Sequence, residues 1–142
     1  MIALILERYH EPHRADLERL QKLAQMCAEE SLMAGVAALH ELLELHMFKE
    51  EMRAFPMIEQ GSSGLLGHLA VDMMEEHLRI EALSTQLQQQ IGALPREGAG
   101  GTLSELHTVA ERFFSDLEEH ARLEDELLFR PLVTTRLQPI AG

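Results

Sequence analysis

His46-Met-Phe-Lys-Glu50 and His120-Ala-Arg-Leu-Glu124 share one pattern, in which a glutamate follows a histidine by four residues. In both copies a phenylalanine stands five residues after the glutamate, and a proline follows closely. Residues i and i+4 lie on one face of an α-helix. Two helices that turned these pairs inward would bring two imidazoles and two carboxylates to one point. The repeat therefore predicts a metal site, and a site for two ions in particular.

The composition favours one helical domain. The chain has 142 residues, which predicts a single domain over residues 1–142. Hydrophobic residues make up 46% of it, enough for a core. Only 4% is aromatic and tryptophan is absent, so the core must consist mostly of Leu, Ala, Met and Ile, which favours helices over strands.

The charge and the cysteine content exclude several kinds of partner and setting. The formal net charge is −12, and such a surface repels phosphate backbones and anionic membranes, so we expect neither nucleic acid nor a membrane as partner. Cys27 is the only cysteine, so no intramolecular disulfide can form. The apolar N-terminal stretch is too short for a signal peptide, and no run reaches transmembrane length. We expect a cytoplasmic protein.

Turn-forming residues divide the chain into four segments with helical patterns. The main breaks are Gly61–Gly64 and the glycine-rich stretch 92–102, with a weaker break at 30–35. The expected helices cover residues 4–30, 32–60, 65–91 and a segment that begins at 102. Four helices of similar length with short connections predict an all-α, up-down-up-down four-helix bundle.

Local signals refine the helix ends. Pro12 is expected to kink the first helix or to mark a restart at its first turn. Thr102 and Glu105 predict a capping box at the start of the fourth helix. The tail after Pro131 is expected to be irregular.

Apolar residues spaced alternately three and four apart mark the inward face of each expected helix, and in the fourth helix this stripe ends at Leu127. Every stripe is interrupted by histidine, and two are also interrupted by glutamate. The interrupting residues are His10, His13, His46, Glu50, His77, His120 and Glu124. A buried carboxylate without a partner is costly, and a metal ion would compensate for it. The structural alternative is a metal-free interaction module in which these side chains hydrogen-bond to one another.

The remaining histidines serve as an internal control. At about 100° per residue, His40, His68 and His107 point away from the faces that carry His46, His77 and His120. We expect the first three to face outward or sideways and not to bind metal.

These motifs resemble the hemerythrin-like HHE cation-binding family over nearly the whole chain. Within the family they are most similar to the di-iron proteins that repair iron centres after nitrosative and oxidative stress. The stretches that carry the resemblance are Arg8–Glu11, His46–Glu51 with Phe55-Pro56, Glu76-His77, and His120–Glu124 with Phe129. One His-x-x-x-Glu alone is a weak signal, but two at these positions with two further histidines are specific.

The resemblance implies the fold and the ligands of a hemerythrin-like centre. It implies two non-haem iron ions, joined by an oxo or hydroxo bridge, with Glu50 and Glu124 as bridging ligands. The terminal ligands would be His10, His46, His77 and His120.

Two positions depart from relatives. Oxygen-carrying hemerythrins have a further histidine where this chain has Met73, and repair proteins have one about 21 residues after the first ligand, where this chain has Ser31. The site is therefore expected to lack one protein ligand. Three outcomes stay open: His13 substitutes as a ligand, the position is open or holds water, or one metal is held weakly. His13 is alternatively a hydrogen-bond partner of a ligand.

By resemblance, the leading functional expectation is defence against nitrosative or oxidative damage. The protein would donate iron to damaged iron–sulfur proteins or react with nitric oxide. The alternative is an oxygen-binding, storage or sensing protein without turnover. The sequence does not indicate an oligomeric state.

Overall fold

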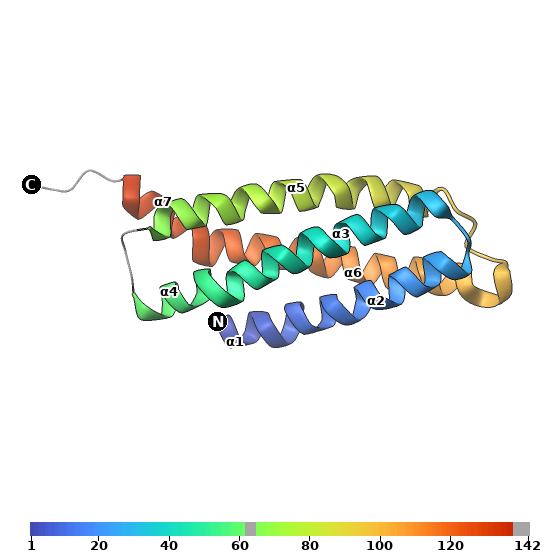
Figure 1. Cartoon of the computed structure of the whole chain (residues 1–142), viewed down its shortest axis with the longest axis horizontal. Coiled ribbons are helices and arrows are strands. Elements are labelled where there is room, and N and C mark those ends of the chain that lie inside the picture. Colours follow the sequence, from blue (N-terminus) through green and yellow to red (C-terminus); the bar gives the residue numbers. More distant parts are fainter. Residues whose placement is uncertain (62–64, 138–142) are drawn as a thin grey trace, which may run out of the picture.

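The computed structural model describes residues 1–61 and 65–137, and within these residues it contains helices and no strand (Figure 1). The long helices are α2 (Glu11–Met26), α3 (Glu30–Lys49), α5 (Leu66–Gly92) and α6 (Thr102–Glu124). The short helices α1 (Ile2–Ile5), α4 (Phe55–Gln60) and α7 (Arg130–Leu137) lie at one end. Successive long helices alternate in direction, and both α2 and α5 pack against α3 and α6. The predicted up-down-up-down bundle is confirmed.

Three passages through the bundle contain a π-helical segment. These are η1 (Leu6–His10), η2 (Glu50–Ala54) and η4 (Asp125–Phe129). A proline follows each segment in the first turn of the next α-helix: Pro12, Pro56 and Pro131. Proline has no N–H to donate to the preceding turn, and a widened turn accommodates that gap. The expected restart at Pro12 therefore takes the form of a π turn that passes directly into α2.

The π segments change which residues face inward. In a π turn the hydrogen bonds run from i to i+5, so one extra residue separates side chains on the same face. Phe55 and Phe129, each five residues after its glutamate, are buried. Leu127, which the three-four stripe places inward, is 52% exposed. That prediction was wrong because the stripe assumed α-helical spacing through η4.

Two further local predictions were wrong. The chain after Pro131 continues as α7 to Leu137, because the preceding π turn lets a proline begin a helix; residues 138–142 lie outside the described part. The capping box is also absent. Gly101 is the N-cap of α6, and no side chain caps that end. Glu105 instead accepts hydrogen bonds from the guanidinium of Arg19 on α2.

Gly35 does not break a helix, although the sequence suggested a weak break near it. It lies within α3 where that helix approaches α5, and a Cβ built there would lie 2.5 Å from Cδ2 of Leu87. The glycine thus permits close packing of the two helices.

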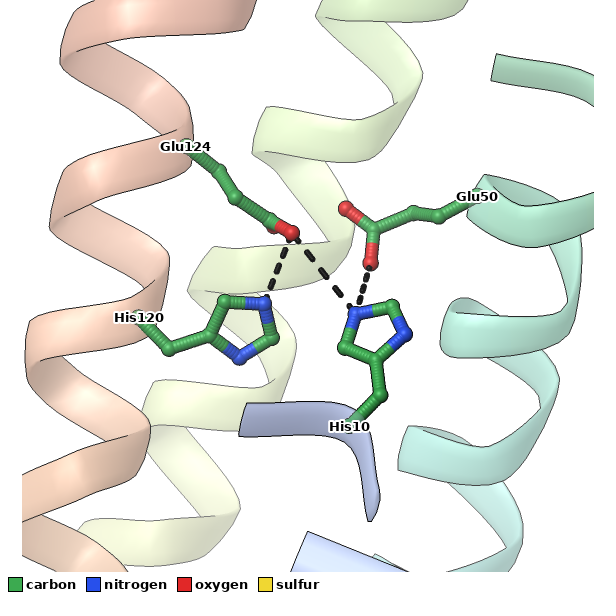
Figure 2. A group of neighbouring side chains, drawn as sticks. All are labelled: His10, Glu50, His120 and Glu124. Atoms are coloured by element: carbon green, nitrogen blue, oxygen red, sulfur yellow. Dashed lines mark hydrogen bonds and ion pairs between the residues drawn. The ribbon is translucent and has the colours of Figure 1, made fainter. Parts of the chain in front are cut away.

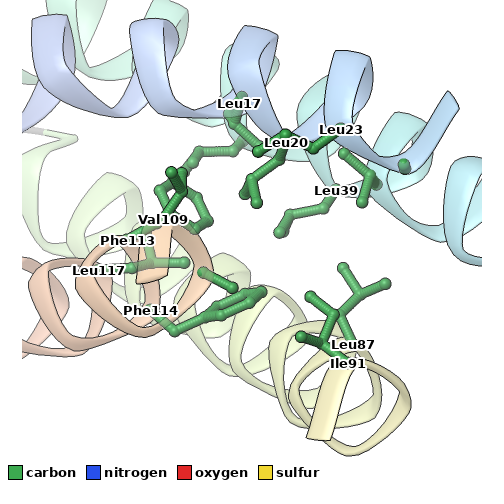
Figure 3. Packing of buried hydrophobic residues seen from close by; sticks show 14 of the residues in the cluster. Leu17, Leu20, Leu23, Leu39, Leu87, Ile91, Val109, Phe113, Phe114 and Leu117 are labelled. Carbon is green, nitrogen blue, oxygen red and sulfur yellow. The ribbon is translucent and has the colours of Figure 1, made fainter. Parts of the chain in front are cut away.

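Two apolar clusters enclose a polar layer. The larger cluster fills the bundle between α2, α3, α5 and α6, with residues such as Leu20, Leu39 and Phe113 at its centre (Figure 3). The smaller one lies near the short helices and contains Ile5, Ala54, Phe55, Ala70, Met73 and Phe129. The polar residues of the four stripes lie between these clusters, and the apolar side chains on both sides shield them from solvent.

Candidate metal centre

Six of the seven polar residues that interrupt the four stripes, all but His13, converge into two groups that share their carboxylates. One group consists of His10, Glu50, His120 and Glu124, which point toward one another in Figure 2. The other consists of His46, Glu50, His77 and Glu124. Within each group, one potential ligand atom from every residue lies within 4.8 Å of all the others, and all six side chains are buried. The arrangement is that of a site for two metal ions.

Each shared glutamate turns one oxygen toward each group. Oε1 of Glu50 lies 3.1 Å from Nε2 of His10, while its Oε2 lies 3.5 Å from Nε2 of His46. Oε2 of Glu124 lies 2.7 Å from Nε2 of His120, while its Oε1 lies 2.9 Å from Nε2 of His77. Each of the two carboxylates therefore faces both ligand groups.

The donor atoms fit a cation better than they fit one another. Buried polar atoms in proteins nearly always have hydrogen-bond partners. Among the described residues eight such side-chain atoms have none, and two of them, Nδ1 of His13 and Oγ of Ser84, lie outside the two ligand groups. The other six are Nε2 of His10, His46 and His77, both oxygens of Glu50, and Oε1 of Glu124. All six belong to the two groups. Imidazole nitrogens and carboxylate oxygens are ligands of first-row transition metals, so bound ions would satisfy every one of these atoms.

Three of the six residues lie at or next to the ends of the π-helical segments. His10 ends η1, Glu50 begins η2, and Glu124 immediately precedes η4. Isolated π turns occur frequently at functional sites because the extra residue re-aims side chains. The three π segments therefore lie at the ligand cluster itself.

Three carboxylates hold the imidazoles from behind. Nδ1 of His10 donates to Glu51 at 2.7 Å, and Nδ1 of His77 donates to Asp125 at 2.7 Å. Nδ1 of His46 donates to Glu76 at 2.8 Å. Such bonds fix the ring orientation and leave Nε2 available to a metal.

Sequence reasoning missed these orienting roles. The side chain of Glu51, to which the sequence analysis assigns no role, is only 22% exposed because it binds both Arg14 and His10. A signal existed in the sequence. In each repeat a second acid directly follows the first, as Glu50-Glu51 and Glu124-Asp125. The first acid faces the ligand cluster and the second reaches a histidine on a neighbouring segment.

His120 differs from the other three histidines. Its Nδ1 lies 3.1 Å from Nε2 of His13, which is buried and belongs to neither ligand group. The ring of Tyr9 stacks on that of His120, with ring centroids 4.9 Å apart and planes at 8°. His13 thus lies within hydrogen-bond distance of His120 and outside both ligand groups.

The pKa values reflect the mutual attraction of these groups when no cation is bound. Burial lowers the pKa of His10, but the nearby carboxylates of Glu124 and Glu50 outweigh it and raise the pKa to about 10. His77 is raised to about 10 and His46 to about 9 in the same way, against burial, by their carboxylate partners. Burial opposes the ionisation of Glu124, yet the neighbouring histidines hold its pKa well below the usual value. Without a metal, protons on the imidazoles balance the buried carboxylates.

His13 shows the opposite shift. Burial, together with the neighbouring His120 and His10, lowers its pKa to about 3. It is therefore a neutral imidazole at ordinary pH.

The control histidines stay outside both groups, as expected. His68 is exposed and His40 is half-buried beside Gln21. His107 is not outward, however. It is buried because its Nε2 donates to the backbone carbonyls of Leu94 and Pro95, at the end of the bundle away from the ligand cluster.

The two positions where relatives have a further histidine lie in different parts of the bundle. Met73 is buried in the smaller apolar cluster, one turn before His77. Ser31 lies outside the site, because α2 already ends at Met26 and Ser31 belongs to the first turn of α3. The hydroxyl of Ser31 accepts a hydrogen bond from the side chain of Gln90 on α5. Neither Met73 nor Ser31 belongs to the two ligand groups.

A groove of about 430 Å³ runs between α5 and α6 and reaches the ligand cluster at His77. Ile80, Phe114 and Leu117 form part of its apolar lining, while Arg122 and Asp125 contribute charge. No helix among the described residues is both long and apolar enough to cross a membrane.

Comparison with known proteins agrees with this geometry. The model of the hemerythrin HHE cation binding domain matches residues 68–141. The iron-sulfur cluster repair protein DnrN of Neisseria gonorrhoeae is 37% identical over 134 residues, which cover 88% of this chain and 85% of that protein.

The iron-sulfur cluster repair protein YtfE of Yersinia pestis (strain Pestoides F) is 34% identical over 139 residues, and so is YtfE of Yersinia pseudotuberculosis (serotype O:1b). These alignments cover 91% of this chain but 63% of each relative's length. The family match over more than half of the chain and the similarity to DnrN over most of both proteins lead to one conclusion: the chain belongs to the hemerythrin HHE cation-binding family.

Proposed function

We propose that this protein binds two non-haem iron ions and uses them in the cytoplasm to protect or repair iron–sulfur centres under nitrosative or oxidative stress. The observation that carries the proposal is the pair of buried ligand groups, six of whose donor atoms lack hydrogen-bond partners. The names of the relatives support the repair role. The partners would be damaged iron–sulfur proteins.

Each residue of the cluster has a role in this proposal. His10 and His120 would bind one ion, His46 and His77 the other, and Glu50 and Glu124 would bridge the two. Four neutral imidazoles and two carboxylates leave a modest net charge, which permits the irons to cycle between ferrous and ferric states. Bridging carboxylates offset the repulsion between the two cations.

The direct test is metal analysis followed by a repair assay. Protein purified from cells grown with iron should contain two irons per chain, with an optical and Mössbauer spectrum of a coupled pair. The loaded protein should then restore activity to an iron–sulfur enzyme that nitric oxide has damaged, and metal-free protein should not. Absence of stoichiometric metal would overturn the proposal.

One feature favours a second candidate, the binding of a small ligand such as oxygen or nitric oxide without turnover. The groove beside His77 and Asp125 offers a route from solvent to the His46 and His77 side of the cluster. A stable oxygenated form in the optical spectrum of the loaded protein would support this candidate. Rapid autoxidation would count against it.

A further inference from the structure

The two ligand groups differ in what lies behind their imidazoles. We call the group with His10 and His120 the first half, and the group with His46 and His77 the second half. Both halves share the two glutamates, so these cannot distinguish them. Any difference in affinity must come from the partners of the four Nδ1 atoms and from the charges around them.

The second half has a carboxylate behind each imidazole. Glu76 accepts from His46 and Asp125 accepts from His77. An anionic acceptor makes an imidazole a more basic ligand, and loss of such a partner typically weakens metal binding by about 10- to 100-fold. Lys49 offsets the charge of Glu76. Among the described residues Asp125 has no ion pair except with His77, so its charge remains to favour a cation.

The first half has only one such carboxylate, and its charge is offset. Glu51 accepts from His10 but also pairs with the guanidinium of Arg14 at 2.9 Å. When Nε2 of His120 holds a cation, its Nδ1 carries the proton and donates it to Nε2 of His13. A neutral acceptor gives His120 no anionic support.

We infer that the first half holds its metal ion more weakly than the second, and that His13 sets this difference as the positioning residue of His120. This inference rests on the proposed function, in which it identifies the ion that the protein gives up. The second-half ion would remain in place while the first is transferred. His13 keeps the His120 ring oriented for metal binding, but as a neutral acceptor it does not strengthen the bond between His120 and the metal ion.

Removal of iron by a chelator tests the inference on the whole chain. The protein is loaded anaerobically with two equivalents of ferrous iron and mixed with an excess of a bipyridine-type chelator, and the coloured complex is followed over time. Wild type should release iron in two phases of equal amplitude. The fast phase is assigned to the first half.

Three variants distinguish the halves. His13→Glu places a carboxylate behind His120 and should slow the fast phase about tenfold or more. Asp125→Asn removes the carboxylate behind His77 and should accelerate the slow phase by a similar factor. His13→Gln keeps a neutral acceptor and should leave both phases close to those of wild type, which separates charge from mere occupancy of the position.

The outcomes are distinct. The inference is overturned if His13→Glu leaves the fast phase unchanged, or if Asp125→Asn accelerates the fast phase in place of the slow one. Circular dichroism shows whether His13→Glu folds. If it does not, Asp125→Asn decides alone, because in that variant the slow phase of iron release should approach the fast one. Binding of fewer than two irons by wild type would instead contradict the proposed function, so the two failures are distinguishable.

Discussion

Oε1 of Glu124 lies 2.9 Å from Nε2 of His77, although the two residues belong to different helices. The other oxygen of the same carboxylate faces His120 at 2.7 Å. A single side chain thus contacts both halves of the cluster. Its loss should affect both ions, whereas the loss of any one histidine affects only one.

We therefore expect Glu50→Gln combined with Glu124→Gln to abolish metal binding. An amide keeps the shape of the side chain but carries no charge to offset two cations. Iron content per chain, measured after anaerobic reconstitution, should fall from two to none. Glu59→Gln, an exposed change on α4, is the matched control and should retain both irons. Unchanged metal content and stability in the double variant would favour the metal-free interaction module.

The stability of the metal-free protein should fall as the pH rises above neutrality. The pKa values of His10, His46 and His77 are raised from 6.5 to about 9 or 10 in the folded state. Their contribution is therefore complete below pH 6.5 and is lost as the pH passes through 9 to 10. Glu124, whose pKa is held well below its ordinary value of 4.5, stabilises the folded state above pH 4.5 and loses that contribution in acid.

Thermal unfolding of metal-free and metal-loaded protein across this range checks the sign. Metal binding requires neutral imidazoles, so the stabilisation by metal should grow as the pH rises from 6.5 toward 9. The two unfolding midpoints should diverge over that interval. A metal-free midpoint that rises between these pH values would contradict the assignment of the protons.

The sequence predicted the ligand cluster because its signal is local and strong. Histidine and glutamate at core positions of an amphipathic helix conflict with burial, and the conflict recurred on all four stripes. The roles of Glu51 and Asp125 were not predictable in this way, because each side chain reaches a histidine on another segment. Their targets depend on how the helices pack, which no single-helix pattern contains.

The π turns explain most of the remaining errors. A stripe with α-helical spacing cannot anticipate an inserted residue, so Leu127 was placed inward and the helix after Pro131 was missed. The five-residue spacing from Glu124 to Phe129 was visible in the sequence, but without the fold it had no interpretation. The first helix, expected to reach residue 30, ends at Met26, because the sequence there has no strong stop signal.

Phe129 and Leu127 offer a matched test of the π register. Phe129 is 1% exposed and lies near His77 with ring centroids 6.0 Å apart, while Leu127 is 52% exposed. Phe129→Ala should lower the free energy of unfolding by about 3–5 kcal/mol. Leu127→Ala should change it by no more than about 0.5 kcal/mol. Chemical denaturation of the metal-free proteins gives both values, and a larger loss for Leu127→Ala would restore the α-helical register.

The start of α6 gives a test of the absent capping box. Thr102 is the first helical residue and Gly101, at φ 90°, is the N-cap, so the threonine side chain caps nothing. Thr102→Ala should change the free energy of unfolding by no more than about 0.5 kcal/mol, whereas loss of a true cap costs about 1 kcal/mol. Gly101→Ala should cost about 1–2 kcal/mol, because a Cβ is unfavourable in the left-handed region. Urea denaturation of the two variants compares these values directly. If Thr102→Ala were the more damaging change, the helix would begin one residue later, with the threonine as its cap.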